Sequence, residues 1–290
     1  MPGYLETLRH FGCGDGSVST DTYVHELGVR MPERDLGLRL MSAPRPVIDH
    51  AALQILAVDP RVRLVDNCHA VSLEHRHGRV TALNVDGPKG LERLVTELVV
   101  DASGPSGLSG RWLTAVDGRA VRTDSTRPDQ WYVSIEVDAP ADWADTPRFW
   151  LIFPTVPATR GGLISPTGDG RWYVSLSGRS GDAVPRNFPD MIDYADTLDD
   201  PIIGTLLRGA APARVPRTYR KLTSSWHRFD LHPNVLAGLL PIGDAIASLN
   251  PLFGQGISVL AWQASVLAEV VGGGGHHDDP AVATRRYLEG

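Results

Sequence analysis

The chain has 290 residues, of which 42% are apolar and 21% are charged, a composition typical of a soluble globular protein with one large domain or two packed ones. The net charge is −6 at pH 7, and the lysines and arginines are scattered along the sequence. These features exclude an extended basic surface, so neither nucleic acid nor an anionic membrane is expected as a partner.

The two cysteines, Cys13 and Cys68, lie far apart without metal-type spacing. This excludes a disulfide framework and favours a reducing compartment. The apolar runs are too short to span a membrane, and the first residues do not form an export signal. We therefore expect a cytoplasmic protein without a membrane span.

The first part of the chain predicts a helix followed by a β-meander. Pro46 suits the first turn of a helix over 46–57, and Arg45 stands immediately before it. The predicted strands that follow are 62–65, 70–74, 80–85 and 98–101. The last of these is continuously apolar, as in a buried parallel strand, and it ends in Asp101-Ala-Ser-Gly104.

The middle of the chain predicts an antiparallel sheet. Its expected strands are 130–137, 148–153, 162–166 and 171–177. A hairpin turn is expected at Thr167-Gly-Asp-Gly170, and we expect Trp150, Trp172 and Tyr173 to pack in the core. Helices are predicted at 188–197 and 202–207.

The last part predicts a strand at 235–242 and a helix at 256–271. Glu269 is the single charged residue of that helix, so we expect the helix to be mostly enclosed. Four glycines then end it. The following His276-His277-Asp278-Asp279 is interpreted as a polar surface tail rather than as a metal site, and no metal is expected.

The stretch from Leu240 to Gly256 carries the strongest functional signal. An apolar strand ends in Gly243-Asp244, and a loop with Pro251 and Gly254 then opens a helix. Glycines let backbone N–H groups approach a ligand, and a helix N-terminus favours negative charge. The pattern therefore predicts a site for a polar, electron-accepting ring. The alternative is a tight strand-to-helix connection without a ligand.

Three anchors in this order resemble a known family: Arg45 before a helix, Asp101-Ala-Ser-Gly104 after a strand, and the Gly243-Asp244 stretch. The sequence resembles the FAD-dependent oxidoreductases that include group A hydroxylases, epoxidases, flavin halogenases and geranylgeranyl reductases. The resemblance implies a mixed α/β fold, with a Rossmann-like FAD-binding domain on a parallel sheet and an antiparallel substrate-binding sheet. The implied domains are 1–104 with 235–290, and 105–234.

The resemblance also implies roles for individual residues. Asp244 of the Gly243-Asp244 motif would hydrogen-bond the ribityl chain of FAD. The backbone of Pro251, Gly254, Gln255 and Gly256 would lie against the isoalloxazine ring.

Asp101 and Gly104 correspond to a second flavin-contacting motif. Arg45 corresponds to an arginine that reaches the phosphate or ribityl part of the cofactor. No acid or base can be named from the sequence, so the catalytic residues are unknown.

The sequence departs from the family in three places. After Gly104, where the family usually has Arg-x-Ser, Pro105-Ser106-Gly107 follows, which weakens the expectation of close cofactor contacts in that loop. The expected strand, Gly-x-Gly-x-x-Gly turn and helix for the FAD pyrophosphate is missing, and Gly12-Cys-Gly14-Asp-Gly16 is interpreted as a loop. The sequence is thus expected to be a fragment of a flavoenzyme, a subunit whose partner chain supplies this unit, or a remnant, and to bind FAD weakly. Trp131-Tyr-Val-Ser-Ile135 lacks the second tryptophan of the halogenase motif, which argues against halogenation.

For a complete enzyme, the resemblance implies a monooxygenase acting on a small organic molecule. NAD(P)H would reduce FAD, and a flavin C4a-hydroperoxide would transfer oxygen to the substrate in a hydroxylation or epoxidation. The alternative chemistry is reduction of an isoprenoid double bond by the reduced flavin without O₂.

Overall fold

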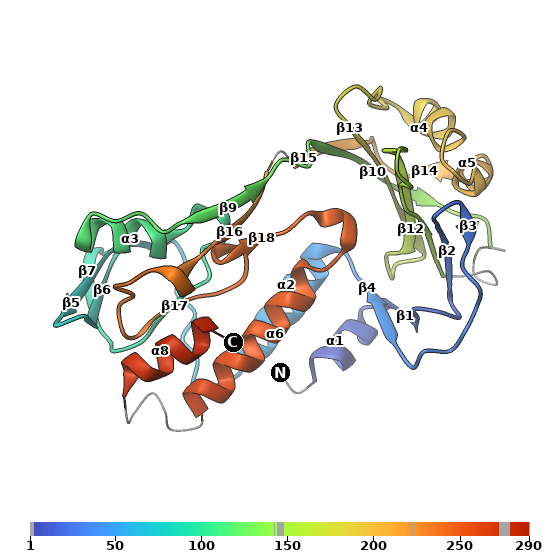
Figure 1. Ribbon diagram of the computed structural model, residues 1–290. Helices are drawn as coiled ribbons and strands as arrows, with labels where there is room; N and C mark the ends of the chain where they lie inside the picture. Colours follow the sequence, from blue (N-terminus) through green and yellow to red (C-terminus); the bar gives the residue numbers. More distant parts are fainter. Residues whose placement is uncertain (1–2, 142, 144–147, 222, 273–278, 290) are drawn as a thin grey trace. The chain divides into compact units, whose positions relative to one another are not determined.

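The computed structural model describes residues 3–141, 143, 148–221, 223–272 and 279–289, and it combines helices with parallel and antiparallel strands (Figure 1). The mixed α/β fold predicted from the sequence is confirmed. The chain divides into two compact units. Unit 1 contains residues 1–64 and 129–220, and unit 2 contains residues 65–128 and 221–290.

Unit 1 is built on one large sheet whose strands run in the order β14, β10, β13, β12, β11, β2 and β3, with β15 also paired to β10. Its strands are β2 (Thr22–Glu26), β3 (Val29–Arg30), β10 (Gln130–Asp138), β11 (Phe149–Ile152), β12 (Gly161–Pro166), β13 (Arg171–Arg179), β14 (Ala211–Pro212) and β15 (Arg217–Lys221). Strands β2 and β11 pair in parallel, whereas the pairs β10–β13, β10–β14, β11–β12, β12–β13 and β2–β3 are antiparallel.

The remaining elements of unit 1 are a small antiparallel sheet and four helices. They are α1 (Tyr4–His10), β1 (Gly14–Ser17), β4 (Arg39–Ser42), α2 (Arg45–Ala57), α4 (Phe188–Ala195) and α5 (Ile202–Leu207). The predicted helices at 46–57, 188–197 and 202–207 are therefore confirmed. The predicted loop at Gly12–Gly16 is wrong for its second half, because Gly14, Asp15 and Gly16 pair with Met41 and its neighbours across β1 and β4.

Strand alternation gives the large sheet of unit 1 a core face and an opposite face. Val133, Ile135 and Val137 of β10 are at most 3% exposed and pack with α4 and α5 residues in one cluster. Trp150 and Trp172 pack there too, as predicted. Tyr173, however, lies on the opposite face and is 38% exposed, because side chains of successive strand residues point to opposite sides.

Unit 2 contains three small sheets and the helices that join them. Its elements are β5 (His69–Arg76), β6 (Arg79–Gly87), β7 (Gly90–Val95), β8 (Val99–Asp101), η1 (Gly104–Ser106), α3 (Leu108–Asp117), β9 (Thr123–Thr126), β16 (Ser224–His227), η3 (Phe229–Leu231), β17 (Leu239–Pro241), η4 (Gly243–Ala245), β18 (Ala247–Ser248), η5 (Pro251–Phe253), α6 (Gly256–Gly272) and α8 (Pro280–Glu289). The predicted meander is present as the antiparallel sheet β5, β6 and β7.

Two strand predictions need correction, and one strand was missed. Residues 62–65 form no strand, and the meander contains β7, which was not predicted. The strand predicted at 235–242 is shortened to Leu239–Pro241, because Gly238 has φ +87° and breaks the extended backbone just before it.

The two compact units divide the chain at other residues than the implied FAD-binding and substrate-binding domains, which stay a prediction. Residues 1–64 join unit 1 because β2 pairs with β11, where Trp150 lies opposite Tyr23. Residues 105–128 and 221–234 join unit 2 because β9 and β16 pair with β18. These pairings link residues far apart in the sequence, so local sequence patterns do not predict them.

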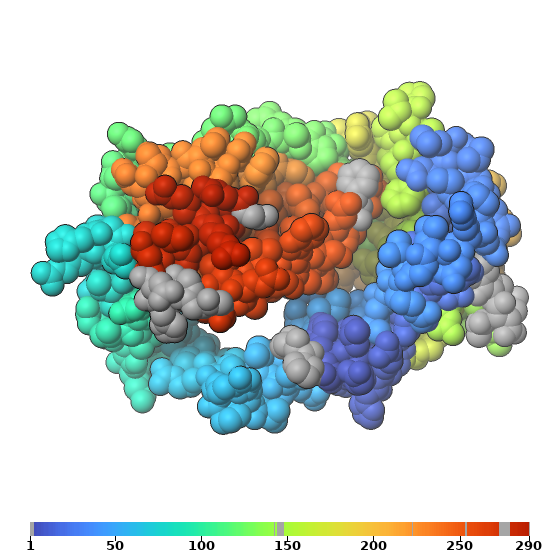
Figure 2. Space-filling view, turned by 60° about the horizontal axis from the view of Figure 1, so that its bottom comes forward, coloured from blue at the N-terminus to red at the C-terminus, as the bar shows by residue number. Residues whose placement is uncertain are grey.

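Helix α6 is present as predicted, but the expectation that it is mostly enclosed is wrong. Its Val270 is buried with α8 residues, whereas Ile257 is 49%, Leu260 39% and Trp262 71% exposed. The orange-to-red atoms of α6 and α8 reach the molecular surface in Figure 2. Described residues pack against one side of this helix only, although its side chains are apolar on nearly all sides.

Candidate functional site

The candidate site of unit 2 lies where two parallel strands end together. Strands β8 and β17 pair in parallel, with Leu239 opposite Val99 and Pro241 opposite Asp101. The N–H of Ile242 donates to the carbonyl of Asp101 at 2.9 Å, so strands β8 and β17 end at the same level of the sheet. In α/β folds, ligands bind beyond the carboxyl ends of such strands.

Immediately after β17, the turn η4 presents Asp244 to solvent. Gly243 has φ +64°, a left-handed conformation that favours glycine, and its N–H donates to Oε1 of Gln263 at 2.6 Å. Asp244 is exposed, and within the described residues its carboxylate has no hydrogen-bond or ion-pair partner. The turn is therefore fixed by its backbone, while the carboxylate stays available to a ligand.

The loop from Asn250 to Gly256 has open space beside its two glycines. The side chain of Asn250 accepts a hydrogen bond from the N–H of Leu252 at 3.1 Å, which starts η5. A Cβ added to Gly254 or Gly256 would meet no atom within 4 Å. Space is therefore free beside this backbone, and the first N–H groups of α6 lack helical partners.

Asp101 is used within its own loop. Its carboxylate accepts from the N–H of Ser103 at 3.0 Å, and from the N–H and the hydroxyl of Ser109 at 2.7 and 2.6 Å. Burial raises the pKa of Asp101, but the hydrogen bonds from Ser103 and Ser109 outweigh it and hold the pKa below its usual value. Asp101 therefore shapes the loop that carries Gly104.

Gly104 brings this loop to the other predicted residues. It has φ +70° and open space beside its Cα, and η1 lies against both η4 and β18. Helix α6 lies against η4 as well. The structure thus gathers Gly104, Gly243, Asp244 and helix α6, through its Gln263, in one region of unit 2.

Arg45 belongs to unit 1 and begins α2. Its Nε lies 2.8 Å from Oδ1 of Asp49, one helical turn later, and its side chain is 72% exposed. An exposed pair of this kind contributes only about 0.3–0.5 kcal/mol, so another anion can easily replace Asp49 as the partner of Arg45. The role assigned to Arg45 stays a prediction.

No family model matches the sequence. Protein Rv3254 of Mycobacterium tuberculosis is 29% identical over 200 residues, which make up 67% of this chain and 42% of that protein. The chain therefore spans less than half the length of the curated relative that it matches.

Solved structures match nearly the whole chain. PqsL, an FAD-dependent monooxygenase from Pseudomonas aeruginosa, has a TM-score of 0.75 at 13% identity, with 99% of this chain and 76% of PqsL covered. The chain has the fold of flavin-dependent monooxygenases. The flavin-dependent brominase Bmp2 follows at TM-score 0.70 and 16% identity, covering 99% of this chain and 70% of Bmp2. The p-nitrophenol 4-monooxygenase PnpA from Pseudomonas putida DLL-E4 has TM-score 0.67 at 15% identity, covering 99% and 72%.

The flavin-dependent monooxygenase fold confirms the fold that the sequence resemblance implied. At such low identities the shared fold with Bmp2 says nothing about halogenation, so the argument against it from Trp131 and Ile135 stays a prediction.

Several residues that support the site were missed by sequence reasoning. Gln263 was detectable as a polar residue in an apolar helix, whereas Ser109 gave no signal. Helix α8 holds β17 in place, because the hydroxyl of Tyr287 donates to the carbonyl of Pro241 at 2.9 Å and the N–H of Gly238 donates to Thr284 at 2.9 Å. Burial raises the pKa of Tyr287 to about 12.

Within the described parts of the chain, no group of three or more His, Cys, Asp or Glu side chains could hold a metal ion. His276, His277 and Asp278 lie outside the described residues, and Asp279 pairs with Arg79. In the same ranges, no helix is both long and apolar enough to cross a membrane.

Proposed function

We propose that this chain binds the flavin-ring and ribityl half of FAD and belongs to a monooxygenase that hydroxylates or epoxidises a small organic molecule. The observation that carries the proposal is the exposed carboxylate of Asp244, which follows the ends of β8 and β17 and has no partner among the described residues. The open space beside Gly254 and Gly256, later in the same stretch of chain, supports it. A ligand with hydroxyl groups and a flat ring fits these features, and the fold is that of flavin-dependent monooxygenases.

In this proposal, Asp244 accepts hydrogen bonds from the ribityl hydroxyls. The open faces of Gly254 and Gly256 admit a flat ring beside Pro251 and Gln255, and the N-terminal N–H groups of α6 stabilise negative charge near that ring. FAD, when bound, supplies the redox chemistry between NAD(P)H and O₂. Gly104 shapes the neighbouring turn, and Arg45 would reach the phosphate or ribityl part. A cytoplasmic location belongs to the same proposal.

The opposite face of the large sheet in unit 1 supplies the proposed substrate surface. Across paired strands β10 and β13, Ser134 lies opposite Ser175, and their hydroxyls are 2.9 Å apart. Tyr132 and Tyr173 lie on the same face by strand alternation. This surface combines aromatic rings with hydroxyl groups, so it fits an aromatic or other flat substrate with hydrogen-bonding groups.

We further propose that a βαβ unit from another segment or a partner chain pairs with β8. Among the described strands β8 pairs with β17 alone. Val99 and Asp101 direct their backbone bonds to that strand, so the N–H and carbonyl of Val100 point to the other edge. Parallel sheets are normally covered on both faces, and the exposed Ile257 and Leu260 of α6 offer further apolar surface.

Titration with FAD tests the proposed function. Added FAD should bind the purified chain weakly, with quenching of flavin fluorescence, and Asp244→Ala should weaken the binding further. No binding at any FAD concentration would refute the proposal. Tight stoichiometric flavin after purification would refute the weak binding and the need for the βαβ unit.

A second assay distinguishes the two proposed chemistries. A monooxygenase consumes NAD(P)H together with O₂ when its substrate is present. The reductase alternative consumes NAD(P)H without O₂.

A further inference from the structure

Lys221 occupies an unusual position for a cation in this protein. The sequence has two lysines, Lys89 and Lys221, among 28 basic residues. The ammonium of Lys221 donates to the hydroxyl of Ser248 at 2.5 Å. Ser248 is 3% exposed and Lys221 is half-buried, so this positive charge is held close to the protein interior.

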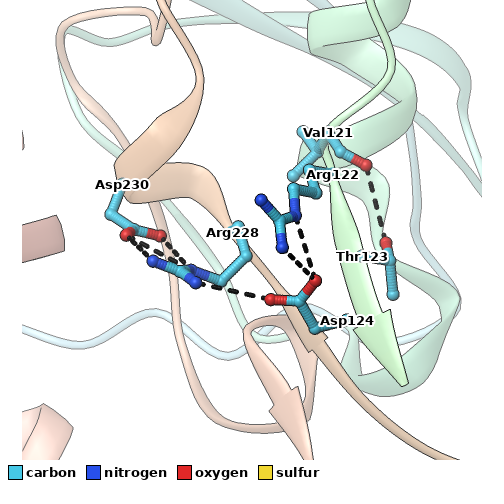
Figure 3. A network of polar contacts seen from close by, with 6 residues as sticks. All are labelled: Val121, Arg122, Thr123, Asp124, Arg228 and Asp230. Carbon is cyan, nitrogen blue, oxygen red and sulfur yellow. Dashed lines mark hydrogen bonds and ion pairs between the residues drawn. The ribbon is translucent and has the colours of Figure 1, made fainter.

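No carboxylate of the described residues lies within ion-pair distance of Lys221. Arg122 and Arg228, which flank the strands β9 and β16, behave differently. Asp124 lies between Arg122 and Arg228, and Asp230 pairs with Arg228 (Figure 3). The ion-pair distances from Asp124 are 2.9 Å to Arg122 and 3.4 Å to Arg228, and Asp230 lies 2.6 Å from Arg228. Both arginines have carboxylate partners, whereas Lys221 has none among the residues that the structure describes. A half-buried cation of this kind is stabilised by an anion from outside the chain.

The position of Lys221 links it to the candidate site. Ser248 belongs to β18, and β18 lies against both η1 and η4, which carry Gly104 and Asp244. Two residues after Ser248, Asn250 begins the open loop to Gly256. The ammonium is thus held by the strand that enters the proposed flavin loop.

We propose that Lys221, positioned by Ser248, forms an anion subsite of this region and binds an anionic oxygen of a bound ligand. The inference rests on the proposed function and adds to it a residue and a ligand chemistry. The anionic oxygen has two sources, the ring of the reduced flavin or a carboxylate of an aromatic substrate. A compact ammonium with three donors can pair with either one while keeping its bond to Ser248.

Differential acetylation tests the subsite without requiring activity. The purified chain is treated with acetic anhydride, and the acetylation rates of Lys221 and Lys89 are compared by mass spectrometry. The probes are oxidised FAD, FAD reduced with dithionite, and sodium benzoate, with sodium chloride at matched ionic strength as the control. We expect at least one probe to slow acetylation of Lys221 about fivefold or more and to leave Lys89 unchanged.

The outcomes separate the two ligand sources and the two proposals. Protection by reduced but not oxidised FAD assigns the flavin ring, and protection by benzoate assigns a substrate carboxylate. If no probe protects Lys221, or if sodium chloride protects it equally, the subsite is refuted, even when flavin binding upholds the proposed function. If benzoate protects Lys221 but FAD never binds, the proposed function fails while the subsite stands.

Variants of Lys221 provide a second test, because a purely structural role of Lys221 would not change the ligand affinity or the midpoint potential of bound FAD. For whichever probe protects Lys221, K221M should raise the dissociation constant about tenfold, since hydrogen bonds to charged groups are the stronger ones. K221R should keep most of the affinity because it keeps the charge. If reduced flavin is the source, K221M should lower the midpoint potential of bound FAD by about 30 mV, the equivalent of that tenfold change for two electrons. Equal affinities and potentials in K221M and the unchanged protein would overturn the proposal.

Discussion

Ser109→Ala should destabilise unit 2 through the buried carboxylate of Asp101. Ser109 is fully buried and Asp101 is 4% exposed, and the substitution removes the hydroxyl that donates to the carboxylate at 2.6 Å. A hydrogen bond to a charged group contributes about 1.5–3 kcal/mol, and alanine returns about 0.5 kcal/mol through its better helix propensity in α3. The free energy of unfolding should therefore fall by about 1–2.5 kcal/mol at pH 7.

The effect of Ser109→Ala should depend on pH in a defined direction. The hydrogen bonds from Ser103 and Ser109 hold the pKa of Asp101 below its usual value despite burial. A lowered folded pKa stabilises the protein above the unfolded pKa of about 4, and this stability is lost as pH falls through the folded value. Losing the hydroxyl raises the folded pKa, so the difference between variant and unchanged protein should shrink below about pH 4.

Urea unfolding followed by circular dichroism at pH 7 and at about pH 3.5 measures both effects. Ser106→Ala is the matched control, because its exposed hydroxyl donates to a neutral carbonyl, that of Ser103, at 2.9 Å. The control should change the free energy by less than about 0.5 kcal/mol. Equal losses in the two variants, or a loss from Ser109→Ala that is the same at both pH values, would refute the reasoning.

Three further variants test the frame of the site. Gly238→Ala should abolish folding of unit 2, seen as a loss of soluble protein, because the new Cβ would lie 2.0 Å from the carbonyl oxygen of Glu97. The control Gly110→Ala should be tolerated, because its Cβ would make only an ordinary contact. Equal yields of soluble protein from the two variants would contradict this prediction. Gln263→Leu should lower the free energy of unfolding in urea by about 1–2 kcal/mol, because it leaves the N–H of Gly243 without its acceptor. Gln263→Glu keeps an acceptor and should lower the free energy less. A larger loss from Gln263→Glu than from Gln263→Leu would contradict the prediction. Asp244→Ala should leave the free energy of unfolding within about 0.5 kcal/mol while weakening FAD binding, and a large loss of stability would show that Asp244 is structural.

Much of the local structure was predictable from the sequence. The turn at Thr167–Gly170 joins β12 and β13 as expected, and helix α6 begins at Gly256. The Gly243-Asp244 turn also follows its strand as predicted. These features depend on residues close together in the chain, whose φ preferences and hydrophobic periodicity are visible locally.

The tertiary structure alone decided the hydrogen-bond partners and the burial of those residues. The sequence marked Asp101 and Asp244 alike as ligand-binding acids, but folding places Ser109 against the first and leaves the second exposed. It placed α6 at the surface although its composition predicts a buried helix. Burial and hydrogen bonding depend on which distant segments of the chain come together, and the pattern of neighbouring residues does not reveal those segments.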